Sequence, residues 1–548
     1  MILIDYVIVF VFMAFLFWAG SVFYRWVGTP DDFFVAGRQL TPFILAATIA
    51  ATNVNLYSFV GQAGVAYKSG ISIIWQTWTG NMALVFSGLF VIPILRRLQI
   101  RTIPEFLEMR YNSLVRYFVG FLWIFRLAFW LGVVLYTAVV AAQTLTGLHS
   151  FTLWVIVFSV ITIIYTMLGG MWSVALTDTL QFVFMLASSL IVLPLVMAAV
   201  GWWPGLVEKI AENHLQLVSQ TGTYNWKFIL AIWILGIEWA CVDQGLLQRA
   251  FGGANTRTVA KGLVLAGIIT TPFALLWNLP GLAASILFPG LANADSAIPM
   301  VLVTYVPNIV LGFVFCGLLA AQMSTISANL NSVATLFTND LYTRIFHKNA
   351  TGKDVLRVAR LITVITGIFM MAFSYLVPKL GGAVEAYLTV IAILDMPLFV
   401  IAIFYGLLWK RCNWQGAFAG YVAGALAGSI AKFVLGYDFN TATFYSAGAT
   451  LLFTPLISFL TKPVQGAQLQ EIWKMRTISD EEIQSGSIYH IWPQTTAGKV
   501  LLGVVAGGLV VFLGGIIMGS TGSGYAGHVA VTGMVIYFIG GLIRLRYD

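Results

Sequence analysis

The chain has 548 residues, of which 59% are apolar and only 9% are charged. A soluble globular protein carries about 25% charged residues, so this chain has too little polar surface to cover a water-soluble particle. This composition excludes a soluble enzyme and a disordered protein. The net charge of +8 does not indicate nucleic-acid binding, because the basic residues lie in short loops between apolar runs. The three cysteines are far apart and form no CxxC motif, which excludes a disulfide scaffold and a cysteine-based metal site.

Apolar runs of about 20 residues, long enough to cross a bilayer as helices, recur along the whole chain. We predict fifteen such spans, at residues 3–24, 40–60, 71–95, 116–145, 151–169, 173–200, 226–248, 259–288, 300–337, 357–378, 384–409, 415–436, 443–461, 498–518 and 527–544. The protein is therefore expected to be an all-α integral membrane protein.

The basic residues predict how these spans are oriented. With the N-terminus outside, the cytoplasmic loops hold 23 of the 29 Lys and Arg residues and the outer loops hold five. Cytoplasmic loops are normally enriched in Lys and Arg. We therefore expect the N-terminus outside, the C-terminus inside and a multi-pass location in the cell membrane.

The long polar segment 463–497 is predicted to be a cytoplasmic connecting loop, with a regulatory element as the alternative. It is too short for a catalytic domain. No GxxxxGK[ST] motif occurs in the chain, which argues against ATP-driven pumping.

Five ionisable residues fall inside predicted spans, where charge is costly and suggests function. They are Arg126, Asp178, Glu238, Asp243 and Asp395. We interpret Asp243 mainly as a helix cap or ion-pair partner, and for Asp178 interfacial exposure is as reasonable as function. Glu238 and Asp395 are each candidates for a substrate or proton ligand, or for a pair with Arg126.

Residues 46–61 place small and polar side chains near the predicted bilayer middle, around Thr52, Asn53 and Asn55. Such residues compete for backbone hydrogen bonds and are poor in the middle of a helix. A break here would free carbonyl oxygens, which membranes tolerate where the backbone lines a site. The alternative is close helix packing by small residues.

A second unusual segment is 317–342, where Ser324, Ser327, Asn331 and Thr335 recur at helical spacing. These side chains would form one stripe of hydroxyl and amide groups. Na⁺ is a hard cation that prefers oxygen ligands. The chemistry alone leaves a Na⁺ site and a packing stripe equally open.

The stripe carries a resemblance to a known family. The segment Gly-Leu-Leu-Ala-Ala-x-Met-Ser-Thr-x-Ser-x-x-Leu-Asn-Ser-x-Ala-Thr-x-x-x-x-Asp-Leu-Tyr resembles the signature of the sodium/solute symporter family. Shorter motifs at 101–112, 169–181, 241–249 and 406–410 occur in the family's order, and the one at 241–249 is nearest to the sodium/glucose cotransporter branch. The similarity covers about residues 30–435.

The resemblance implies the LeuT-type fold, in which five helices are repeated with inverted topology around a site at the membrane midplane. The implied organisation is an extra helix at 1–30, a first repeat at 31–202, a second repeat at 203–411, peripheral helices at 412–462, the cytoplasmic loop at 463–497 and C-terminal peripheral helices at 498–548.

By the same resemblance, one Na⁺ is bound by the backbone carbonyls of Ala51, Val54 and Ala321 and by the hydroxyls of Ser324 and Thr325. The family's second Na⁺ site would use Asp178 and the hydroxyls at the positions of Ser324, Ser327 and residue 328. Residue 328 is Ala here, which lacks the hydroxyl. A second Na⁺ therefore has one ligand fewer than in the family.

The substrate positions match less well. Asn53 corresponds to a sugar-binding asparagine, whereas the other hexose-binding positions fall on Ser58, Thr77, Ile268 and Thr389. The family's glucose carriers hold longer polar side chains there, and an unpaired buried polar group costs about 1–3 kcal/mol. Trp239 lies at the family's aromatic gate, and Trp78 and Glu238 are candidates for a different pocket. The candidate substrate residues are thus Asn53, Ser58, Thr77, Trp78, Glu238, Trp239 and Thr389.

The implied function is a sodium-coupled secondary active symporter that imports a small polar organic solute, such as a sugar, polyol or related metabolite, by alternating access. The expected partners are Na⁺ as coupling ion, the solute and the bilayer, with no other cofactor, no nucleic acid and no obligate protein partner. The alternatives are a symporter of the same fold for an amino acid or carboxylate, and an uncoupled conduit or sensor. An integral-membrane enzyme is disfavoured because the five histidines lie in or near loops and are widely separated.

Overall fold

The computed structural model describes residues 1–548 except 24–28, 464–472, 474–481, 484–487 and 548. Within this described part the chain is helical, and the β-structure consists of two isolated bridges, Leu40 to Gly253 and Ser219 to Asn225. Much of the predicted loop 463–497 lies outside the described residues.

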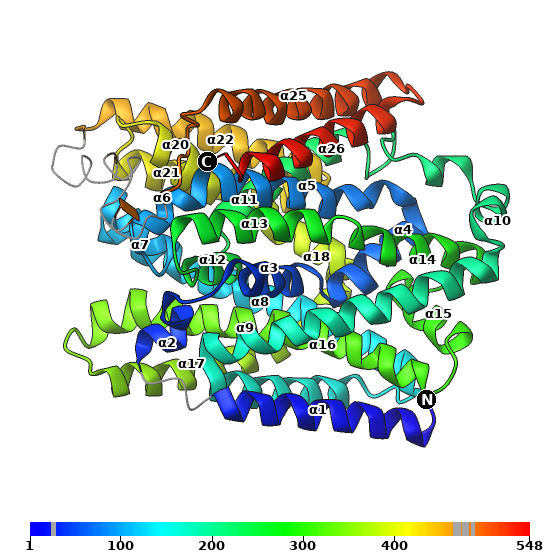
Figure 1. Ribbon diagram of the computed structural model, residues 1–548. Helices are drawn as coiled ribbons and strands as arrows, with labels where there is room; N and C mark the ends of the chain where they lie inside the picture. Colours follow the sequence, from blue (N-terminus) through cyan, green and yellow to red (C-terminus); the bar gives the residue numbers. More distant parts are fainter. Residues whose placement is uncertain (24–28, 464–472, 474–481, 484–487, 548) are drawn as a thin grey trace.

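The helices of the first half are α1 (Leu3–Phe23), α2 (Pro30–Val35), α3 (Pro42–Asn53), α4 (Ala63–Ser69), α5 (Ile74–Phe86), α6 (Ile92–Arg97), α7 (Ile103–Arg110), α8 (Ser113–Thr146), α9 (Phe151–Val200), α10 (Trp202–Lys209), α11 (Trp226–Val242) and α12 (Gln244–Phe251). Those of the second half are α13 (Thr256–Thr270), α14 (Phe273–Leu287), α15 (Ala297–Tyr305), α16 (Val310–Thr335), α17 (Gly352–Ser374), α18 (Ala383–Val390), α19 (Met396–Phe399), α20 (Tyr405–Leu408), α21 (Trp414–Ser429), α22 (Phe439–Leu460), α25 (Thr496–Met518) and α26 (Ala526–Arg544). Figure 1 shows α1 at one edge of the molecule and α25 with α26 at the opposite edge.

The described residues contain 11 helices long and apolar enough to cross a membrane, or 13 when each of two bent helix pairs is one span. All of these coincide with predicted spans. The other two predicted spans, 3–24 and 151–169, correspond to the shorter apolar helices Leu3–Leu16 and Phe151–Ile164. The predicted total of fifteen is therefore not confirmed. In addition, the predicted span 300–337 is divided between the short helix α15 and the long helix α16.

The start of α16 is fixed by a residue from the other end of the sequence. The carboxylate of Asp5 on α1 accepts hydrogen bonds from the backbone N–H groups of Ile309 at 2.7 Å and Gly312 at 3.0 Å. The first N–H groups of a helix have no partner inside it, so an acidic side chain at this position stabilises the helix. Asp5 therefore caps α16 and holds α1 against it.

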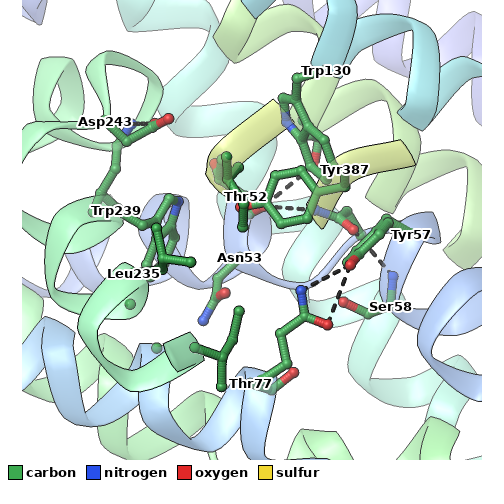
Figure 2. Close-up of a pocket in the computed structure, with 18 of the residues that line it drawn as sticks. Thr52, Asn53, Tyr57, Ser58, Thr77, Trp130, Leu235, Trp239, Asp243 and Tyr387 are labelled. Atoms are coloured by element: carbon green, nitrogen blue, oxygen red, sulfur yellow. Dashed lines mark hydrogen bonds between the residues drawn. The ribbon is translucent and has the colours of Figure 1, made fainter. Parts of the chain in front are cut away.

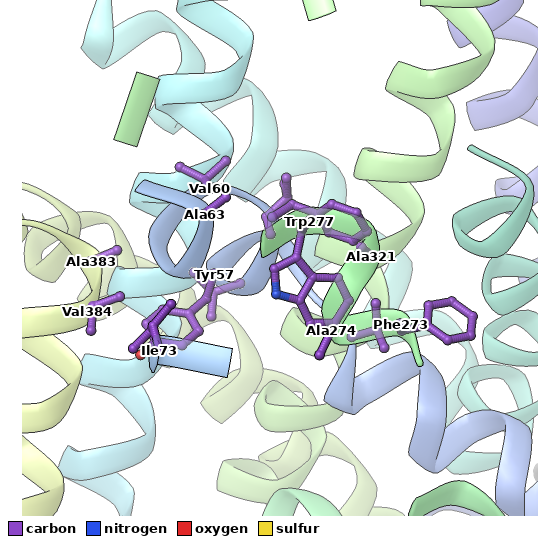
Figure 3. Packing of buried hydrophobic residues seen from close by; sticks show 14 of the residues in the cluster. Tyr57, Val60, Ala63, Ile73, Phe273, Ala274, Trp277, Ala321, Ala383 and Val384 are labelled. Carbon is purple, nitrogen blue, oxygen red and sulfur yellow. The ribbon is translucent and has the colours of Figure 1, made fainter. Parts of the chain in front are cut away.

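The core around α3 and α16 is apolar and tightly filled. Figure 3 shows Trp277 of α14 beside Ala274 and Phe273 of the same helix, with Ala321 of α16 close by. Trp277 and Ala321 are both buried. Trp277 also contacts Phe59, with ring centroids 5.2 Å apart, so α14 packs against the segment that follows α3.

A second kind of packing joins α21 to α22. Glycines on α21 recur every fourth residue and face small hydroxyl side chains of α22, so that the backbones approach closely. The facing pairs are Gly416 with Ser458, Gly420 with Thr454, Gly424 with Thr450 and Gly428 with Ser446. Small residues permit this close approach between membrane helices.

We expect Gly420→Leu to destabilise the protein, because even a Cβ atom at this position would overlap the hydroxyl of Thr454. Overpacking of this kind costs about 1–3 kcal/mol. The measurement is the thermal unfolding midpoint of the purified protein in detergent. Gly448→Leu on α22 is the matched control, since nothing lies within 4 Å of a Cβ at Gly448. Equal midpoints for the two variants would contradict the packing role.

Candidate functional site

The predicted interruption in residues 46–61 is present. Helix α3 ends at Asn53, and Val54 has extended backbone angles of φ −92° and ψ 107°. The chain continues through a π-helical turn, η3 (Tyr57–Gln62), into α4, and the two helical parts are bent by 45°. Because the last carbonyls of a helix have no partner within it, the peptide oxygens near Ala51 and Val54 are available to other ligands.

The polar stripe of α16 faces this interruption. The hydroxyl of Thr325 donates to the carbonyl of Thr52 at 3.4 Å, which joins the two segments directly. Ser324 is buried near the carboxylate of Asp178, and its hydroxyl has no partner within hydrogen-bond distance among the described residues. A buried hydroxyl with this freedom is an oxygen ligand of the kind that a hard cation such as Na⁺ prefers.

Asp178 is buried and belongs to an ion pair. Its Oδ2 accepts a hydrogen bond from Thr48 Oγ1 at 2.6 Å and lies 3.0 Å from the Arg249 guanidinium. Its Oδ1 has no partner within the described part of the chain. Ser327 donates its hydroxyl proton to the carbonyl of Ser324 at 3.1 Å. The interpretation of Asp178 as exposed at the membrane interface is therefore wrong, since its exposure is 0%.

A cavity adjoins the interruption in α3 (Figure 2). Its walls come from α3, η3, α5, α8, α11, α12, α16, α18 and the turn after α18. The lining residues are Thr52, Asn53, Asn55, Tyr57, Ser58, Gln62, Gln76, Thr77, Gly80, Arg126, Trp130, Ile232, Leu235, Gly236, Glu238, Trp239, Asp243, Leu246, Thr325, Asn329, Tyr387 and Ile391. Thr325 thus contacts both the cavity and the break in α3.

Most of the predicted substrate residues meet in this cavity. Asn53, Ser58, Thr77, Glu238 and Trp239 line it. The side chain of Asn53 donates to Asn81 Oδ1 at 2.7 Å, and Thr77 donates to Gln62 Oε1 at 2.9 Å. Part of the polar lining is therefore held in place by neighbouring side chains.

Two predicted substrate residues lie outside the cavity lining. The indole N–H of Trp78 donates to the carbonyl of Thr271 at 3.0 Å. The hydroxyl of Thr389 donates to the carbonyl of Glu385, one turn earlier on α18, at 2.8 Å. Both side chains therefore use their polar groups to secure helices.

A charge cluster occupies one end of the cavity. Arg126 on α8 binds Asp395 through Nε, at 3.1 and 3.0 Å, and through Nη2, at 2.6 Å. Its Nη1 donates to Asp243 at 3.0 Å. Asp243 also caps α12 by accepting from the N–H of Leu246 at 3.1 Å, at the 43° bend between α11 and α12. The predicted cap and ion-pair roles of Asp243 are confirmed, and Asp395 pairs with Arg126.

Glu238 does not take part in that pairing. It is 1% exposed and lines the cavity, and no described residue forms a hydrogen bond with its Oε1. Of the two candidates for a pair with Arg126, Asp395 alone forms one in the described structure.

An aromatic cluster at the cavity was missed by sequence reasoning. Tyr57, Trp130 and Tyr387 contact one another, with ring centroids 5.3, 5.2 and 4.6 Å apart for the pairs Tyr57–Trp130, Tyr57–Tyr387 and Trp130–Tyr387. Such residues are common in any apolar helix core, so no local signal distinguished them. Figure 2 shows them across the cavity from Trp239 and Asp243.

The loop between α14 and α15 closes on α4 and α18 near this aromatic cluster. Asp295 accepts a hydrogen bond from the N–H of Ala383 at 3.3 Å, and a Cβ added to Gly64 would meet its Oδ1 at 3.0 Å. Burial raises the pKa of Asp295 to about 6. The contact between this loop and α18 therefore involves a carboxyl group that titrates at mildly acid pH.

Comparison with known proteins identifies the family. The model of the sodium:solute symporter family matches residues 33–424. The chain is 26% identical over 465 residues to the sodium/glucose cotransporter of Vibrio parahaemolyticus, which covers 79% of this chain and 84% of that protein. It is 28% identical over 529 residues to solute carrier family 5 member 4B of Mus musculus, covering 83% of this chain and 79% of the relative.

A solved structure shows the same fold. A Na⁺-coupled sialic acid symporter in a substrate-bound, outward-open state superimposes with a TM-score of 0.77 over 84% of this chain and 98% of that chain, at 21% identity. The likeness shows a shared LeuT-type helical architecture. Because the family model spans well over half of the chain, this protein belongs to the sodium:solute symporter family.

Proposed function

We propose that the protein imports a small polar organic solute, such as a sugar, polyol or related metabolite, by Na⁺-coupled symport across the cell membrane. The observation that carries the proposal is the position of Thr325. This residue binds the carbonyl of Thr52 at the break in α3 and also lines the cavity. An ion bound at the break and a solute bound in the cavity would therefore both contact Thr325.

The proposed Na⁺ ligands are the carbonyls of Ala51, Val54 and Ala321 and the hydroxyls of Ser324 and Thr325. Their support is the interrupted helix, the buried hydroxyl of Ser324 without a described partner and the contact of Thr325 with the α3 backbone. A second Na⁺ at Asp178 and Ser327 has weaker support, because Arg249 already neutralises Asp178.

The proposed organisation has two inverted repeats, at 31–202 and 203–411, with the N-terminus outside and the C-terminus inside. The two bent helix pairs support it, since α3 with α4 and α11 with α12 each form the first core helix of one repeat. In transporters built this way, interrupted helices meet at the substrate site. The cavity lies between these two bends.

In the proposed cycle, Na⁺ joins the end of α3 to α16 and fixes the wall of the cavity that contains Thr52 and Thr325. The solute then binds against Asn53, Ser58, Thr77, Glu238 and Trp239, and the helix groups move to expose the other side. A membrane potential of about 100 mV supplies roughly 2.3 kcal/mol per charge and a tenfold Na⁺ gradient about 1.4 kcal/mol, so one Na⁺ supports roughly 500-fold accumulation of a neutral solute.

Uptake into proteoliposomes tests the proposed function. With an inward Na⁺ gradient and a panel of labelled sugars, polyols, amino acids and small carboxylates, we expect accumulation of one class that collapses when K⁺ replaces Na⁺. Accumulation driven equally well by a pH gradient without Na⁺ would contradict Na⁺ coupling. Flux without accumulation would show an uncoupled conduit.

Replacing Ser324 and Thr325 together with Ala tests the ion site. Loss of two oxygen ligands should raise the Na⁺ concentration for half-maximal uptake by about tenfold or more. The matched control is Thr363→Ala on α17, a buried threonine whose hydroxyl donates to its own helix at Ala359. Unchanged Na⁺ activation in the double variant would refute the assignment of these two ligands.

A further inference from the structure

We infer that the cavity takes a solute carrying a positively charged nitrogen, with Glu238 as the carboxylate that receives it. The inference rests on the proposed symport function and narrows its substrate class. It follows from the charges around the cavity, from the hydrogen-bond state of Glu238 and from the aromatic rings that line the same space.

The charges around the cavity do not balance within the described residues. Arg126 is the one cationic side chain in the lining, and it faces three carboxylates, those of Glu238, Asp243 and Asp395. All three nitrogens of its guanidinium already bind Asp395 or Asp243. A carboxylate at Glu238 therefore has no cationic partner of its own among the described residues.

The environment makes an unbalanced carboxylate costly. Glu238 lies on the membrane helix α11 and is buried in the protein interior, and its Oε1 has no described hydrogen-bond partner. Burying a charge is unfavourable unless the charge is paired and hydrogen-bonded. A ligand with an ammonium group at this end of the cavity would supply both the charge and, where it carries N–H, the hydrogen bond.

The rings in the cavity wall favour the same ligand. Trp239 follows Glu238 directly on α11, and Tyr57, Trp130 and Tyr387 form the opposite wall (Figure 2). Tyr387 also lies close enough to Glu238, Asp243 and Asp395 to interact with their charges. Aromatic faces attract organic cations, and rings that line a pocket are used to recognise quaternary ammonium ligands. A neutral polyol would use none of this electrostatic complementarity.

Matched pairs of probes test the inference on the full-length protein in nanodiscs at saturating Na⁺ and neutral pH. Choline is compared with its uncharged analogue 3,3-dimethylbutan-1-ol, and glucosamine with glucose. Binding is followed by tryptophan fluorescence and calorimetry. We expect the charged member of at least one pair to bind about tenfold or more tightly than its neutral partner, as a charge-assisted contact requires.

The variant Glu238→Gln keeps the shape of the side chain and removes the charge, so it should abolish the preference within that pair. Glu208→Gln, at an exposed position on α10, is the control and should keep it. Equal binding within both pairs, failure of both charged probes to bind, or a preference that survives Glu238→Gln would overturn the inference. The last result would indicate that Glu238 carries a proton.

Na⁺ binding, measured in the same samples without any solute, separates the two proposals. A Na⁺-dependent rise in thermal stability that persists while the charged probes fail refutes the solute class and leaves symport standing. If Na⁺ does not raise the thermal stability of the wild-type protein, the proposed function itself is refuted.

Discussion

The structure depends on one constraint: a peptide group freed inside a membrane protein must find a partner other than lipid. Helix α3 stops at Asn53 in the interior, and the carbonyl of Thr52 receives the hydroxyl of Thr325. The partner has to come from a neighbouring helix, so α16 carries hydroxyl groups where an ordinary membrane helix would carry leucine. Those hydroxyls make α16 too polar to face lipid, and the surrounding helices bury it.

The second interruption is also stabilised by a neighbouring helix, here through ion pairs. Asp243 lies at the bend between α11 and α12, and Arg126 on α8 binds both Asp243 and Asp395, which ends the turn η10 (Ile391–Asp395). One guanidinium thus joins three separate segments around the cavity. Each bend is held by a side chain of a neighbouring helix, Thr325 of α16 at the first and Arg126 of α8 at the second.

Local sequence patterns predicted the features with a local cause. Length and hydropathy placed the spans, the cluster of Thr52, Asn53 and Asn55 indicated the interruption, and the position of Asp243 near the predicted cytoplasmic end of its helix indicated a cap or an ion pair. Spacing alone did not separate a Na⁺ site from a packing stripe along α16, and the family resemblance supplied the ligand set.

The features that sequence reasoning missed or left open arise from contacts between distant segments. Arg249 pairs with Asp178 across 71 residues, and Arg126 selects Asp395 and not Glu238 across 269 residues. No periodicity encodes such choices, because they are decided by which helix faces pack together. Thr389 was also placed wrongly. It lies outside the cavity lining, and its hydroxyl donates to the carbonyl of Glu385 on its own helix.

The capping of α16 by Asp5 has a consequence for the part of the chain that the family model does not cover. The matched region begins at residue 33, beyond α1. Yet Asp5 holds two N–H groups at the start of the helix that carries Ser324 and Thr325. Any tilt of α16 must carry α1 with it or break both bonds to a buried carboxylate. The first helix is therefore tied mechanically to the helix that carries the proposed Na⁺ ligands, so a displacement of α1 would be transmitted to α16.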